Sequence, residues 1–126
     1  MTQPHKNLIA WQRADDLWLL IHKASHELPR EERFELASQL RRAAYSVPAN
    51  IVEGYAYEAH PMRLKHLRIA VASLAEVGYG IQMARSLGYL TPSRAVEIQE
   101  ALRRTAAPLH GLIGHFKRER PTHRQC

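Results

Sequence analysis

Eight histidines are the residues in this 126-residue chain that most directly raise the possibility of metal chemistry. Imidazole nitrogen is a common zinc ligand, and two histidines four positions apart on a helix lie on the same face. His22 and His26 have this spacing. The surrounding sequence offers no third ligand at a suitable position, although Glu27 is adjacent to His26. We therefore expect solvated or packed histidines, and we predict no metal and no cofactor.

Motifs for catalysis are weaker still. Glu53 and Glu76 could form a carboxylate pair, the arrangement that general acid–base catalysis uses. A structural, hydrogen-bonded role beside Arg42, Asn50 or Ser73 explains the same two residues more simply. The chain has no glycine-rich phosphate loop, no Glu-x-x-His motif of di-iron bundles, and a single cysteine that is its last residue. We predict no catalytic residues and a protein that is not an enzyme.

Arginine and lysine give the clearest functional lead, because the formal net charge is +6 at pH 7. A guanidinium binds phosphate through paired, charge-assisted hydrogen bonds, so clustered arginines suit a nucleic-acid backbone. Between Ala59 and Ser93 the only acidic residue is Glu76. The candidate phosphate-binding residues are Arg41 and Arg42, then Arg63, Lys65 and Arg68, then Arg103 and Arg104, and finally Lys117, Arg118, Arg120 and Arg124. The alternative is that these charges belong to ordinary solvated helix faces.

Four segments with helical periodicity must position these residues, and together they predict an all-α fold. Hydrophobic residues make up 45% and charged residues 24% of the chain, the balance of a globular protein. The predicted helices span residues 7–28, 31–55, 61–87 and 93–117. Short connections favour antiparallel neighbours, so we expect a single domain built as an up-down-up-down four-helix bundle. Residues 118–126 are expected to form a basic C-terminal tail.

The apolar stripes of the predicted helices indicate which side chains form the core. The first stripe is Leu8, Trp11, Ala14, Trp18, Ile21, Ser25 and Leu28, and the second is Phe34, Ala37, Leu40, Ala44, Val47 and Ile51. Pro48 and Pro108 lie inside predicted helices and should kink them, because proline removes a backbone N–H donor. Gly54 and Gly88 are expected to end the second and third helices.

The second predicted helix has an unusual face opposite its apolar stripe. Small and amide side chains stand there, where an exposed helix would carry long charged ones. Small side chains let another backbone approach closely, which favours contact with another subunit or a bound partner. The alternative is an exposed face that simply tolerates these residues. The candidates for the contact are Gln39, Ala43, Ser46, Pro48, Asn50 and Glu53.

The segment from Gln39 to Gly54, QLRRAAYSVPANIVEG, resembles the signature of a family of four-helix-bundle proteins. These are the 23S ribosomal RNA intervening-sequence proteins, which are related to the accessory protein of diversity-generating retroelements. The matches that support this resemblance are Leu8, Trp11-Gln12-Arg13-Ala14, Ala70, Ser73 and Glu76. Ser73 and Glu76 therefore join the candidates for the oligomer interface. The resemblance spans about residues 8–115.

The resemblance implies a bundle that assembles as a homopentameric ring with a basic surface for nucleic acid, RNA especially, and without enzymatic activity. In the retroelement relatives it also implies association with a reverse transcriptase. We therefore predict an oligomeric, non-enzymatic nucleic-acid-binding protein that contacts phosphates. The rival prediction is a scaffold ring that docks a partner protein, such as a nucleic-acid enzyme. The sequence has no membrane-length apolar segment and no signal-peptide-like start, so we expect no membrane partner and a cytoplasmic location.

Overall fold

The computed structural model describes residues 4–119. Within that range the chain forms four α-helices and no strand: α1 (Ile9–Ser25), α2 (Leu36–Ala56), α3 (His60–Ser86) and α4 (Pro92–Arg118). Two short 3-10 helices, η1 (Pro4–Asn7) and η2 (Arg30–Glu32), precede α1 and α2. The predicted all-α fold is confirmed for these residues.

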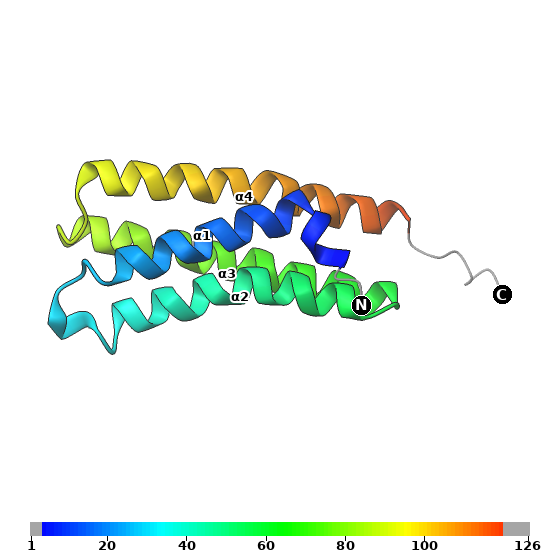
Figure 1. The fold of residues 1–126 in the computed structure, drawn as a ribbon, viewed down its shortest axis with the longest axis horizontal. Helices are drawn as coiled ribbons and strands as arrows, with labels where there is room; N and C mark the ends of the chain where they lie inside the picture. The colour runs from blue at the N-terminus through cyan, green and yellow to red at the C-terminus, as the bar shows by residue number, and fades with distance from the viewer. Residues whose placement is uncertain (1–3, 120–126) are drawn as a thin grey trace.

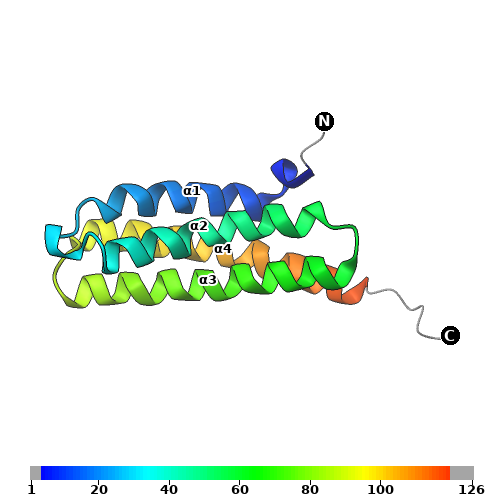
Figure 2. The same cartoon turned by 90° about the horizontal axis from the view of Figure 1, so that it is seen from below.

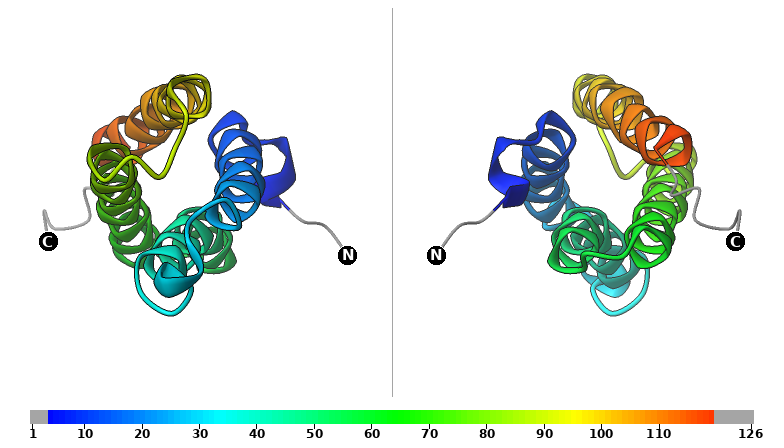
Figure 3. Two further views of the ribbon diagram at one scale, coloured as in Figure 1. Left: turned by 90° about the vertical axis from the view of Figure 1, so that its left-hand side faces the viewer. Right: turned by 90° about the vertical axis from the view of Figure 1, so that its right-hand side faces the viewer.

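Consecutive helices run in opposite directions and pack side by side (Figure 1). The same arrangement is seen from below, with the turn between α2 and α3 at the end of the bundle where α4 finishes (Figure 2). Each helix contacts its neighbours in the chain, and α1 also contacts α4, so the four helices enclose one interior (Figure 3). The contact between α2 and α3 is the most extensive.

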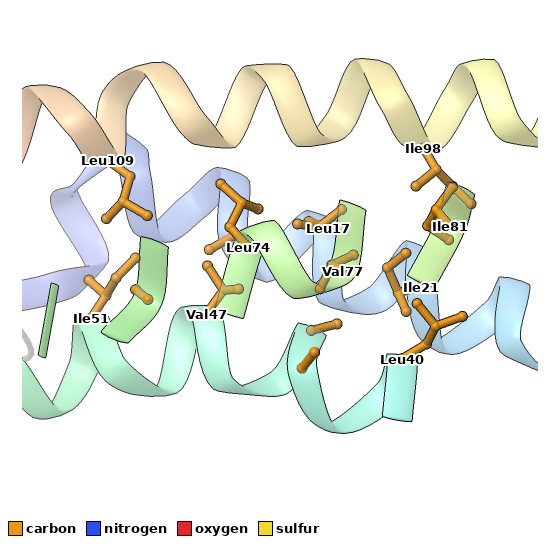
Figure 4. Packing of buried hydrophobic residues seen from close by; sticks show 14 of the residues in the cluster. Leu17, Ile21, Leu40, Val47, Ile51, Leu74, Val77, Ile81, Ile98 and Leu109 are labelled. Carbon is orange, nitrogen blue, oxygen red and sulfur yellow. The ribbon is translucent and has the colours of Figure 1, made fainter. Parts of the chain in front are cut away.

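The core runs along the bundle axis and takes side chains from all four helices (Figure 4). The largest fully buried side chains are Leu17, Ile21, Ile51, Leu67, Ile81, Ile98, Leu109, Val47, Val77 and Thr105. Each aliphatic side chain of this kind stabilises the fold by about 1.5–3 kcal/mol, so apolar burial dominates the energetics. None of the helices in residues 4–119 combines the length and apolar character needed to cross a membrane.

The connection between α1 and α2 departs from the predicted boundaries. Residues 26–35 leave the helical path, so α1 ends at Ser25 and α2 begins only at Leu36. Phe34, which was predicted to lie in the core, is 81% exposed, and the Arg33 guanidinium lies 4.9 Å from its ring centroid. The stripe of α1 is also rotated, since Leu17 is fully buried and Trp18 only half-buried.

The prolines and glycines behave in different ways. Pro48 and Pro108 lie within α2 and α4, and both helices continue past them. Gly88 follows α3 with a φ of +76°, which confirms the predicted helix end. Gly54 does not end α2, which continues to Ala56. It instead permits a close approach of α3, because a Cβ there would lie 3.2 Å from the Cβ of His66.

Candidate functional site

A partly buried network of hydrogen bonds joins α2 to α3. Ser73 Oγ donates to Ser46 Oγ over 2.7 Å, and Asn50 Nδ2 donates to the same Oγ over 2.9 Å. Asn50 Oδ1 then accepts a hydrogen bond from His66 Nδ1 over 2.9 Å. This arrangement places a proton on Nδ1 of the imidazole, because the Asn50 amide is already directed at Ser46. We call these four residues the α2–α3 polar network.

This network changes the explanation for the small residues on α2. Ala43 and Asn50 are buried, and so is Ser73 on α3, which bonds across to α2 within the same chain. α3 of the same chain therefore approaches part of this face closely, where the sequence predicted another subunit or a bound partner. Sequence reasoning missed His66, although it stands in register with Ala70 on the face of α3 that meets α2. A role for these residues in subunit contact stays a prediction.

A groove of about 560 Å³ lies between α1 and α2, and two residues of the polar network, Ser46 and Asn50, form part of its lining. We call it the aromatic groove. Its lining consists of Trp11, Asp15, Trp18, Tyr45, Ser46, Pro48, Ala49, Asn50, Val52 and Glu53. The rings of Trp18 and Tyr45 meet edge to face with centroids 6.3 Å apart. Four of the predicted interface residues, Ser46, Pro48, Asn50 and Glu53, therefore lie together along one groove.

A second, smaller groove of about 250 Å³ lies between α2 and α3. Two further predicted interface residues, Gln39 and Glu76, line it together with the apolar side chains of Tyr79 and Met83. Tyr79 is 64% exposed and Met83 is 37% exposed. This α2–α3 groove thus combines polar and large apolar groups that stay accessible on the outside of the bundle.

Two of the predicted basic clusters meet at one end of the bundle. The last turns of α4 pack beside the start of α3 and the end of α2, because the Phe116 ring contacts those of His60 and Tyr55 at centroid distances of 5.3 and 5.8 Å. Figure 2 shows the end of α4 beside the turn between α2 and α3. The exposed cations of these helix ends, which we call the basic end, are Lys65, Arg68, Lys117 and Arg118.

Arg63 belongs to the same cluster in sequence but has a structural role. Its Nε and Nη2 donate to the backbone oxygens of Gly54 and Tyr57 over 3.3 and 2.8 Å. Its guanidinium also lies 4.5 Å from the ring centroid of Tyr55 and 5.1 Å from that of Phe116. The carbonyls at a helix C-terminus lack partners within the helix, so Arg63 satisfies the end of α2. Arg63 therefore caps α2 in the folded chain, and its contact with phosphate stays a prediction.

The other predicted basic residues lie apart from the basic end. Arg41 donates to Ser25 Oγ over 3.1 Å and to the Arg33 carbonyl over 3.4 Å, and Arg42 is exposed beside it. Arg103 pairs with Glu100 on α4, while Arg104 is exposed. The structure does not gather these residues into one patch. Arg120 and Arg124 lie outside the described residues.

The opposite end of the bundle is held together by polar contacts between its loops. Arg94 at the start of α4 pairs with Glu27 and Glu97, and the Tyr89 hydroxyl donates to Glu32 over 3.0 Å. The hydrogen bond from Arg94 holds the pKa of Glu27 below its ordinary value. The hydrogen bond to Glu32 raises the pKa of Tyr89. Because Arg94 is paired with two carboxylates, this cation is a poor candidate for phosphate binding.

The histidines do not form a cluster of metal ligands in the described part of the chain. The rings of His22 and His26 have centroids 5.0 Å apart, and His26 Nδ1 lies 2.8 Å from the His22 carbonyl oxygen. No three His, Cys, Asp or Glu side chains in residues 4–119 are placed to hold a metal ion together.

Comparison with known proteins places this geometry in a family. A solved structure from Bacteroides thetaiotaomicron, described as a protein of unknown function from the S23 ribosomal protein family, superposes with a TM-score of 0.78. The two sequences are 20% identical over 84% of this chain and 96% of the other, a level of identity that supports the fold alone. No curated protein matches the chain. The family model of the 23S rRNA-intervening sequence protein matches residues 6–111, and the chain therefore belongs to that family.

Proposed function

We propose that this protein is a non-enzymatic, homo-oligomeric nucleic-acid-binding protein whose basic end contacts phosphates. The observation that carries the proposal is that the start of α3, which carries the exposed Lys65 and Arg68, packs beside the end of α4, which carries the exposed Lys117 and Arg118. Lysine and arginine that neutralise phosphates release counterions, which supplies most of the affinity of sequence-independent binding.

The acidic residues near this end leave an excess of positive charge. Glu53 lies near the end of α2, Glu58 precedes α3, and Glu119 follows α4. The carboxylate of Glu119 lies 3.4 Å from Nε2 of His115. Four exposed cations and Arg63 therefore stand against three carboxylates, and a phosphate backbone approaching this end meets net attraction.

RNA is the nucleic acid that we propose, because the name of the family refers to ribosomal RNA. Phosphate contacts fix the position of a nucleic acid but carry no direct sequence information. We therefore expect binding to depend on the shape and charge of the RNA more than on its bases.

Self-association is the second part of the proposal. The α2–α3 groove presents Tyr79 and Met83 beside Gln39 and Glu76, a mixture of apolar and polar groups that suits a subunit contact. Symmetric assembly would repeat the basic end once per subunit, and the summed field would attract a polyanion more strongly than one copy does. The stoichiometry of five rests on the family resemblance.

The test is a fluorescence-anisotropy titration of the purified protein with labelled structured RNA and with duplex DNA across a salt series. We expect affinity to fall linearly in a log–log plot, with a slope of roughly 0.7–0.9 per phosphate contacted. The paired variant Lys65→Ala/Arg68→Ala should lower both affinity and slope. Lys23→Ala/Arg30→Ala removes the same charge from two exposed positions at the other end and serves as the matched control.

Two outcomes would count against this proposal. Equal losses in the two paired variants would mean that only net charge matters and that the basic end is no site. Absence of binding at low salt would favour the rival function, a scaffold that needs a protein partner. The accessible aromatic groove is the observation that keeps this rival function in consideration.

A further inference from the structure

The aromatic groove has a chemistry that phosphate binding does not use. The chain has only two tryptophans, and both Trp11 and Trp18 line this groove together with Tyr45. Among residues 4–119, the charged residues of the lining are Asp15 and Glu53, and both are carboxylates. In a chain with 18 Lys and Arg against 12 Asp and Glu, this local reversal of charge separates the groove from the basic end.

We propose that the aromatic groove binds an arginine-bearing segment of a partner protein. A guanidinium is attracted to the face of an aromatic ring and forms charge-assisted, forked hydrogen bonds with a carboxylate. Arginine fits better than lysine, because its planar group can stack on an indole ring while its edge reaches an acid.

The carboxylates of the groove are available for such a contact. Asp15 is half-buried, and within residues 4–119 no Lys, Arg or His forms an ion pair with it. The Glu53 side chain is 63% exposed, and its carboxylate lies 3.6 Å from His66 Nδ1. An incoming cation therefore needs to displace no arginine or lysine of the described chain.

The polar network and the neighbouring rings hold the groove in place before a ligand arrives. Asn50 and Ser46 are fixed from behind by His66 and Ser73, and the His66 ring stacks on Tyr57 at a centroid distance of 5.5 Å. The Trp18 ring is supported by Tyr45 on one side and by His22, whose ring centroid is 5.5 Å away. Walls that are already ordered reduce the entropy lost on binding.

An arginine of a protein fits this site better than an unpaired RNA base does. Aromatic side chains can stack on either group, but the carboxylates would repel the phosphates on both sides of a base. Arg41 and Arg42 do not line the groove itself. They line an adjoining depression together with Trp18 and Tyr45, and only from there could they counter that repulsion. The inference is independent of nucleic-acid binding at the basic end, so each can fail without the other.

The two tryptophans make the test direct, because all indole emission of the chain arises from the lining of this groove. The probe is a short glycine–serine peptide that carries two arginines. The matched peptide carries citrulline in their place, which keeps the shape of the side chain and removes its charge. We expect a saturable change in emission with the arginine peptide and binding about tenfold weaker with the citrulline peptide.

Variants of neighbouring carboxylates locate the site. Asp15→Asn and Glu53→Gln should each weaken binding of the arginine peptide by about tenfold. Asp16→Asn is the matched control, because Asp16 is adjacent in sequence but exposed, outside the groove, and paired with Arg13 at 4.0 Å. Thermal unfolding by circular dichroism should show that all three variants fold as the wild type does.

Three results would overturn the inference. The first is equal binding of the arginine and citrulline peptides, or no binding of either. The second is a single-stranded RNA oligonucleotide that changes the indole emission and displaces the arginine peptide, which would make the groove a base-stacking site. The third is tryptophan emission that depends on protein concentration while the peptide fails to bind, which would assign the groove to a second copy of the chain.

Discussion

Ser73 on α3 and Ser46 on α2 share a hydrogen bond in which the two Oγ atoms lie 2.7 Å apart. The same Ser46 oxygen accepts from Asn50 Nδ2, and both Ser46 and Asn50 line the aromatic groove. One hydroxyl thus belongs both to the α2–α3 contact and to the wall of a groove on the neighbouring face. A substitution on α3 can therefore alter the groove without lining it.

Ser73→Ala and Asn50→Leu should differ in their effect on stability. Ser73→Ala removes one partly buried hydrogen bond but leaves Ser46 paired with Asn50, so we expect the free energy of unfolding to fall by about 1 kcal/mol. Asn50→Leu also leaves His66 Nδ1 without its amide partner, and should cost about 2–3 kcal/mol. Urea denaturation followed by circular dichroism measures both. Equal costs would show that the network does not act through Asn50.

Two glycine substitutions should have opposite signs. At Gly54 a new Cβ would lie 3.3 Å from the backbone oxygen of Arg63, which cannot move aside easily, so Gly54→Ala should destabilise by about 1–3 kcal/mol. At Gly78, in the interior of α3, no atom lies within 4 Å of the added Cβ. Gly78→Ala should therefore stabilise by about 0.5–1 kcal/mol through helix propensity alone. Stabilisation by Gly54→Ala would contradict the close approach of α2 and α3.

Periodicity was sufficient to predict the four helices and much of the core, because a bundle buries one stripe of each helix. Val47 and Ile51 lie where the stripe of the second helix places them. Phe34 stands in phase with that stripe, yet η2 and the residues after it carry the chain away from the helix axis. An apolar residue in register predicts burial only if the helix exists there, and Phe34 lies before its start.

The site was harder to predict, since the same small residues suit a neighbouring helix and a neighbouring subunit equally well. Ala43 and Asn50 indicated a close contact, but only the position of His66 and Ser73 on α3 identifies a partner within the chain. The role of Arg63 was invisible for a similar reason. Its partners are backbone carbonyls, whose positions depend on how α2 ends and not on residue type.

Arg63 and Arg68 stand five positions apart on α3, and their substitution should separate folding from binding. Arg63→Ala removes two hydrogen bonds that cap α2 and should lower the free energy of unfolding by about 1–3 kcal/mol. Arg68→Ala changes an exposed side chain and should leave stability within about 0.5 kcal/mol. It should instead weaken RNA binding and reduce the salt slope by roughly one phosphate contact. Equal stability of the two variants would remove the capping role from Arg63.

The pair formed by Glu27 and Arg94 should give a dependence of stability on pH. Arg94 lowers the pKa of Glu27 in the folded chain, so the pair stabilises the fold above the ordinary carboxyl pKa of about 4.3 and loses this contribution as pH falls through the lowered value. The Glu27 side chain is 41% exposed, which limits the contribution to less than about 1 kcal/mol. Glu27→Gln should therefore be less stable than the wild type near neutral pH, and the difference should shrink in acid. The control is Glu35→Gln, because Glu35 is exposed and lies outside the ion pairs described for residues 4–119. If Glu27→Gln remains less stable than the wild type below the lowered pKa, the charge of Glu27 is not the source of the difference in stability.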